Sequence, residues 1–145
     1  MRVDFYQLSH SPVEIALPQL AAKMVDAGAR VLVIAGDELL QGRISAALWG
    51  VKDQFLAHGL YGGEHDARQP ILIGNRLDAA NGATYLALAD GQWVDGAETF
   101  ERVFLLFDGS TIDDARATWR KLGEIDGLER NYWRQLSPTS WEKAA

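Results

Sequence analysis

The sequence predicts an α/β domain in three layers, with a mostly parallel, partly mixed sheet flanked by helices. The clearest observation is the continuous run of β-forming residues at 30–35, which is typical of a strand covered on both faces. Helical patterns follow the first two predicted strands, and this alternation indicates βαβ units with parallel strands. A crossover helix has no room between the runs at 71–73 and 84–88, so we expect part of the sheet to be mixed.

The predicted elements alternate along the whole chain. Ser11 is placed to cap the first helix, Pro18 would kink it, and Thr111 with Asp114 resembles a capping box at the third helix. Because no repeat or linker interrupts the pattern, we expect one domain over residues 1–145. The expected strands are residues 3–8, 30–35, 71–73, 84–88 and 103–107, and the helices lie between residues 11 and 28, 37 and 49, and 112 and 123.

Composition narrows the classes of function. The chain has no cysteine, which excludes a thiol nucleophile and a thiolate metal site and fits a reducing compartment. Its N-terminus lacks the features of a signal peptide, and no run of about 20 apolar residues could span a membrane, so we expect a cytoplasmic protein. With a net charge of −6, strong direct binding to nucleic acid is not expected.

Residues for catalysis or cofactor binding are not found in a recognisable pattern. The first strand-to-helix junction reads YQLSHSP, without the glycines that let a backbone cradle phosphate. The three histidines are scattered, which disfavours a metal site. Ser9-His10-Ser11 is interpreted as a turn with a capping serine rather than a nucleophile. We therefore predict no catalytic residues, no metal and no cofactor.

A cationic and aromatic group stands on the last predicted helix. Arg116, Trp119 and Arg120 share one helical face by their i, i+3, i+4 spacing, and Lys121 lies nearby, round the side. Guanidiniums bind carboxylates through paired hydrogen bonds, and an indole accepts an apolar side chain. This group suits an acidic peptide with a hydrophobic last residue and a free carboxylate. The alternative is that Trp119 belongs to the core and the arginines are only solvated.

A second group, around Trp49 and Phe55, lies where the sequence has no clear periodicity. Large aromatic residues in such a segment either pack under a loop or form an exposed patch that marks an interface. Both interpretations stay open from the residues alone.

Taken in order, these residues resemble the chi subunit of bacterial DNA polymerase III over nearly the full length. The resemblance rests on Phe5-Tyr6, Arg30-Val31-Leu32, Ala47-Leu48-Trp49, Phe55 with His58, Pro70-Ile71-Leu72-Ile73, Asn81-Gly82, Glu101-Arg102-Val103, Phe107-Asp108-Gly109, Ala115-Arg116, Trp119-Arg120-Lys121, Tyr132-Trp133 with Gln135, and Trp141-Glu142-Lys143.

The resemblance implies a Rossmann-like fold without nucleotide chemistry and a non-catalytic accessory role in the clamp-loader assembly. It implies binding to the acidic C-terminal tail of single-stranded DNA-binding protein, with Arg116, Trp119 and Arg120 at matching positions. It also implies a bridge to a psi subunit, where one exists, through Trp49 and Phe55. A basic residue of the family's tail site is replaced here by Ile112.

Two other functions stay open. The Trp49 and Phe55 surface could bind another partner such as a helicase. A small hydrolase using His10 or His58 would require a carboxylate or hydroxyl to converge on that histidine.

Overall fold

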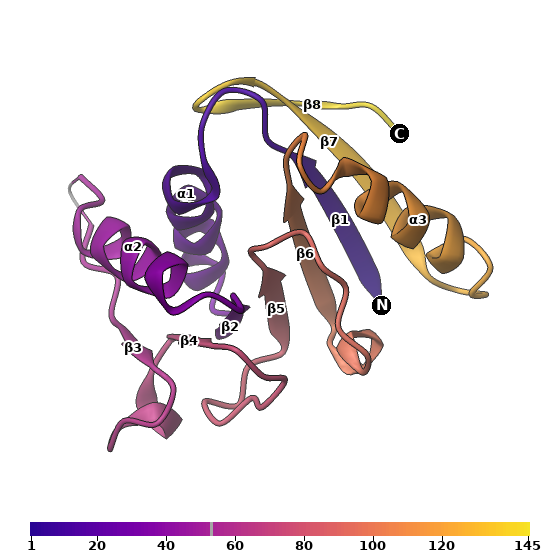
Figure 1. Cartoon of the computed structure of the whole chain (residues 1–145). Coiled ribbons are helices and arrows are strands. Elements are labelled where there is room, and N and C mark those ends of the chain that lie inside the picture. The colour runs from indigo at the N-terminus through magenta and orange to yellow at the C-terminus, as the bar shows by residue number, and fades with distance from the viewer. Residues whose placement is uncertain (53) are drawn as a thin grey trace.

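The computed structural model describes residues 1–52 and 54–145 and contains one eight-stranded sheet (Figure 1). Its helices are α1 (Val13–Asp26), α2 (Glu38–Trp49) and α3 (Ile112–Leu122). Its strands are β1 (Arg2–Gln7), β2 (Val31–Ile34), β3 (His58–Leu60), β4 (Ile71–Gly74), β5 (Tyr85–Leu88), β6 (Arg102–Phe107), β7 (Glu129–Ser137) and β8 (Ser140–Lys143).

The sheet is mostly parallel, as predicted. Its strand order is β3-β4-β2-β5-β6-β1-β7-β8, and among the described strands only the pair β7 and β8 is antiparallel. The sequence-based reason for a mixed sheet was wrong. β4 and β5 lie on either side of β2 and both run parallel to it, so the chain crosses β2 without a helix. The antiparallel pair arises instead from the C-terminal hairpin.

Helices cover both faces and complete the three layers. Figure 1 shows α1 and α2 on one face of the sheet and α3 on the other. Alternation along β1 assigns residues to the two faces, because successive side chains of a strand point in opposite directions. Val3 and Phe5 pack in the core under α3, whereas Tyr6 packs in the core under α1 and α2. The two buried clusters therefore sandwich the sheet.

Helix starts differ from the predicted ones. Pro12, not Ser11, precedes α1, and no side chain caps that helix. Thr111 precedes α3 without capping it, since its hydroxyl accepts a hydrogen bond from Asp108 N instead. Pro18 is buried inside α1, which continues past it to Asp26. The Ser11 hydroxyl accepts instead from Gln135 Nε2 at 2.8 Å. Both predicted caps are therefore wrong, because other partners take up the two hydroxyls.

The buried carboxylate of Asp4 connects three neighbouring strands of the sheet, β6, β1 and β7. Asp4 of β1 is completely buried and accepts from Arg102 Nε of β6 at 2.9 Å. Its carboxylate also lies 3.2 Å from Arg2 Nε and accepts from Trp133 Nε1 of β7 at 3.0 Å. A buried carboxylate is tolerated only when it is paired and hydrogen-bonded, and these contacts supply Asp4 with both.

We predict that Tyr6 makes the fold sensitive to alkaline pH. Burial, with a smaller effect from Asp4, raises the pKa of Tyr6 from 10.0 to about 12. Because the folded state prefers the neutral phenol, this stabilisation is complete below pH 10 and is lost as the pH rises from 10 to about 12. Tyr6→Phe should match the parent in urea unfolding at pH 7 and lose less stability between pH 10 and pH 12. Equal losses in the two proteins would contradict the prediction.

Candidate functional site

α3 carries its charges in the order that its dipole favours. Asp113 and Asp114 lie in the first turn, and Arg120 and Lys121 lie in the last. Ala115 and Leu122 are buried against the sheet, which fixes the helix and turns the basic positions outward.

Trp119 is a half-buried wall beside those basic positions. Its indole packs edge-on against Phe5 at 5.1 Å between ring centroids and against Tyr132 at 5.8 Å. The guanidinium of Arg130, from β7, lies 4.2 Å from the centre of the indole ring, and Arg130 Nη1 donates to the Trp119 carbonyl oxygen at 2.6 Å. The side chain is therefore anchored in the core and covered by a cation, with only part of its surface open.

Arg116 and Arg120 are exposed on α3. Arg116 lies near enough to Tyr132 to lower its pKa, although burial has the larger effect and the pKa of Tyr132 is raised overall. Arg116 and Arg120 are one helical turn apart and share a face. The structure thus brings Arg116 and Trp119 together beside Tyr132, with Arg120 on the same side of α3.

Lys121 lies on the other flank of α3. It lines a hollow with Trp93, Asp95, Glu98 and Ile125, away from Tyr132. Of the four predicted tail-binding residues, Lys121 is therefore the one that the structure does not place beside Trp119.

Two residues of this face, Arg130 and Tyr132, were not among the predicted site residues. They are two positions apart on β7, and alternate residues of a strand share a face. Arg134, two positions further, also lowers the pKa of Tyr132. Alternation from residue 130 to residue 134 could have revealed this strand. We call Arg116, Trp119, Arg120, Arg130 and Tyr132 the α3 face.

Trp49 and Phe55 form an exposed aromatic patch. Their ring centroids are 5.4 Å apart, and their exposed fractions are 53% and 81%. Behind them the buried His58 lies 4.2 Å from the Trp49 ring. The structure therefore favours the exposed patch over packing beneath a loop.

His58 has the neighbouring hydroxyl, that of Ser45, which a hydrolase site would require. Ser45 Oγ lies 2.8 Å from His58 Nε2, and His58 Nδ1 lies 2.8 Å from the carbonyl oxygen of Leu56. With Nδ1–H donating to that carbonyl, Nε2 accepts from Ser45. A nucleophilic serine also needs donors for a developing oxyanion, but Ser45 lies inside α2, where backbone N–H groups bond within the helix. The Ser45 contact instead pins the strand β3 to α2.

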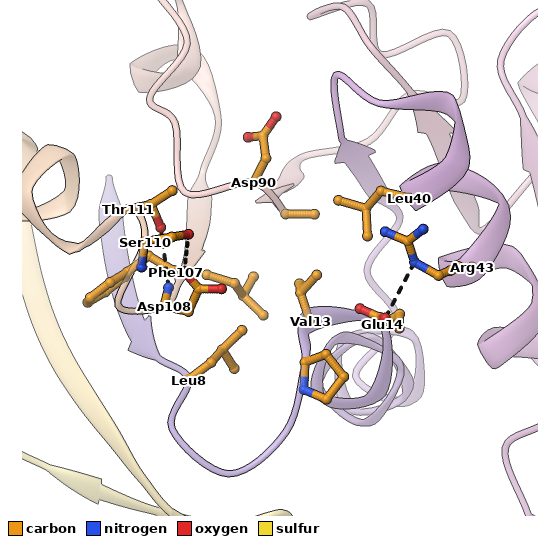
Figure 2. A pocket seen from close by; sticks show the side chains of 13 residues that line it. Leu8, Val13, Glu14, Leu40, Arg43, Asp90, Phe107, Asp108, Ser110 and Thr111 are labelled. Atoms are coloured by element: carbon orange, nitrogen blue, oxygen red, sulfur yellow. Dashed lines mark hydrogen bonds and ion pairs between the residues drawn. The ribbon is translucent and has the colours of Figure 1, made fainter.

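A hollow of about 270 Å³ opens at the carboxyl ends of the central strands, where α1 and α3 leave for opposite faces. Ligands of open α/β sheets bind at this kind of position. Figure 2 shows Asp108 held by Ser110 and Thr111, and Glu14 paired with Arg43. The Ser110 hydroxyl lowers the pKa of Asp108, which keeps a negative charge where a phosphate would lie. These contacts disfavour a nucleotide.

The turn between β1 and α1 is also occupied, by the side chain of Gln135. The backbone N–H groups of Ser9, His10 and Ser11 donate to Gln135 Oε1 at 3.0, 2.9 and 3.2 Å. Such converging N–H groups bind phosphate in nucleotide-binding folds. Here the buried Gln135 of β7 satisfies them, which explains how this fold persists without the glycine motif.

In residues 1–52 and 54–145, no group of three or more histidine, aspartate or glutamate side chains could hold a metal ion. Among the helices of the same ranges, none is both long and apolar enough to cross a membrane.

Comparison with known proteins gives a family. No curated protein matches the chain. Residues 1–127 of the 145 match the family described as DNA polymerase III chi subunit, HolC. The match includes β1 to β6 and α3, and therefore Arg116, Trp119 and Arg120, but ends before Arg130. Because it spans most of the sequence, the chain belongs to the family of the DNA polymerase III chi subunit.

Proposed function

We propose that this accessory subunit of DNA polymerase III links the clamp-loader assembly to single-stranded DNA-binding protein by binding that protein's acidic C-terminal tail. Family membership supports the role of accessory subunit. The observation that carries the finer proposal is the α3 face, where Arg130 covers a half-buried indole and the exposed Arg116 and Arg120 lie on the same side of α3. None of these three guanidiniums lies within 4.0 Å of a carboxylate of the described residues.

The terminal carboxylate of the tail would meet Arg116 and Arg120. Both side chains are exposed and leave their donors to a partner. A guanidinium binds a carboxylate through two parallel hydrogen bonds, which a lysine cannot reproduce. Acidic residues further along the tail would meet Arg130 or Arg134.

The last apolar side chain of the tail would lie on the open part of Trp119. Phe5 and Tyr132 occupy the indole's inner side, and Arg130 covers its ring. The partner's side chain would therefore meet the part of the indole that these three residues leave open. Such a contact buries little area, so the affinity should be micromolar, about −8 kcal/mol.

Weak binding suits a tether. Several tails close together raise the local concentration, so modest contacts hold the complex near protein-coated DNA. The acidic remainder of the chain repels bare DNA and so favours the protein partner. The binding should weaken with salt, because the charges are exposed and the screening length is about 8 Å at physiological ionic strength.

Calorimetry with a tail peptide tests the proposal. The free-acid peptide should bind, and the same peptide with an amidated C-terminus should bind at least about tenfold more weakly, because it loses a charge-assisted hydrogen bond. A scrambled peptide of equal charge is the control. Equal affinity of the acid and the amide would rule out carboxylate capture.

The aromatic patch supports a second interface, to psi where it exists or to another partner such as a helicase. Since Phe55 is 81% exposed, Phe55→Ala should leave the urea midpoint unchanged. The same variant should weaken copurification of that partner strongly, because exposed aromatic residues dominate interface energies. Leu39→Ala, at an apolar position that is 73% exposed, is the control. Undiminished copurification with Phe55→Ala would count against this interface.

A further inference from the structure

A hollow lined by cationic and aromatic residues lies on the face of the sheet opposite α3. Its volume is about 170 Å³, and it lies between the last turns of α1 and the first residues of β5 and β6. It is lined by Tyr6, Leu20, Lys23, Met24, Ala27, Tyr85, Arg102 and Phe104.

The charged lining of this hollow is entirely positive, which is unusual in a chain of net charge −6. Arg102 and Lys23 are its two charged residues, whereas the 270 Å³ hollow and the hollow at Lys121 both include carboxylates in their lining. The Arg102 guanidinium lies 4.5 Å from the centre of the Phe104 ring and 5.9 Å from that of Tyr85, so its position is fixed. Asp4 pairs with both Arg102 and Arg2, and Arg2 also lies 3.5 Å from a Glu129 carboxylate oxygen. Lys23 is the lining cation with no carboxylate within 4.0 Å among the described residues.

Tyr6 adds an unused hydrogen-bonding group. Its side chain is 6% exposed, and its hydroxyl has no hydrogen-bond partner among the described residues. All completely buried side-chain nitrogens and oxygens of those residues do have partners. The Tyr6 hydroxyl must therefore open onto accessible space, and the space that Tyr6 lines is this hollow.

We propose that this hollow binds the carboxylate of a small or terminal group with a flat, apolar body. Arg102 and Lys23 would compensate the charge, the Tyr6 hydroxyl would donate to a carboxylate oxygen, and Tyr85 and Phe104 would contact the body. A doubly charged phosphate fits less well, because the adjacent end of α1 is its C-terminus, where the helix dipole is negative. The site is separate from the α3 face and does not depend on the proposed function.

Chemical-shift mapping with benzoate, and with benzamide as its uncharged counterpart, tests the site on the whole chain. Benzoate should give saturable shifts centred on Tyr6, Lys23 and Tyr85, and benzamide should give none. N-acetylphenylalanine presents the carboxylate as a polypeptide end does. Binding of benzoate alone assigns the site to a free small acid, and binding of both acids assigns it also to a polypeptide terminus.

Substitutions distinguish binding of benzoate in this hollow from nonspecific attraction of an anion to the protein surface. Tyr6→Phe removes only an unpaired hydroxyl, so the fold should persist while benzoate binds about tenfold more weakly. Lys23→Gln should weaken it about twofold to fivefold. Tyr61→Phe and Lys52→Gln, which lie elsewhere, should change nothing. The proposal is overturned if neither acid saturates, if benzamide shifts the same residues, if the shifts centre on α3, or if Tyr6→Phe binds like the parent.

Discussion

Replacing Asp4 with alanine should destabilise the fold by about 3–5 kcal/mol, the range for breaking a buried ion pair by removing one partner. The carboxylate is completely buried and accepts from Arg102 and the Trp133 indole, so its loss strands donors from β6 and β7. Those two strands flank β1, so the substitution weakens the side-chain contacts among three neighbouring strands, β6, β1 and β7. Urea unfolding followed by circular dichroism measures the change.

A matched variant makes this result specific. Asp26→Ala removes a carboxylate that is exposed at the end of α1 and should cost less than about 0.5 kcal/mol. If Asp4→Ala unfolds at the same urea concentration as Asp26→Ala, the contacts around Asp4 contribute little to stability and the account of β1 is wrong.

Arg116→Gln should weaken binding of the tail peptide about tenfold or more, with no change in stability. The side chain is exposed and has no carboxylate partner within 4.0 Å among the described residues, so the fold does not depend on it. A charge-assisted, two-pronged hydrogen bond to the terminal carboxylate supplies the expected loss. Calorimetry at fixed salt measures it, and Arg68→Gln, an exposed arginine before β4, serves as the control.

Arg130 extends the same prediction to a residue outside the region that matched the chi family. Arg130→Lys keeps the charge but loses the planar group over Trp119, so it should weaken tail binding less than Arg130→Gln and more than the control. If Arg116→Gln and both Arg130 variants bind like the parent, the tail binds somewhere other than the α3 face.

Much of the fold could be predicted from local patterns. The run at 30–35 contains β2, and the i, i+3, i+4 spacing correctly placed Arg116, Trp119 and Arg120 on one side of α3. The strands β3, β7 and β8 were not predicted, and β7 forms only through pairing with a distant segment. β7 pairs with β1, more than 120 residues away. Its two buried residues, Asn131 and Gln135, are polar and stand among charged ones, so the segment resembles a solvated tail.

The candidate site was only partly predictable for the same reason. Helical spacing describes neighbours on one helix, whereas Arg130 reaches Trp119 from a strand across the α3–β7 connection. Gly123, just after α3, permits that approach because it has no side chain. A Cβ at this position would lie only 2.8 Å from the Arg130 guanidinium. Lys121 was included from sequence proximity, but its position round the helix takes it to the other flank.

The most direct measurement uses full-length single-stranded DNA-binding protein on single-stranded DNA, in the presence of the chain and of the Arg116→Gln variant. We expect the chain to cosediment with the coated DNA, and removal of the partner's last acidic residues or the Arg116 substitution to release it. Cosedimentation that persists after either change, at physiological salt, would contradict the account.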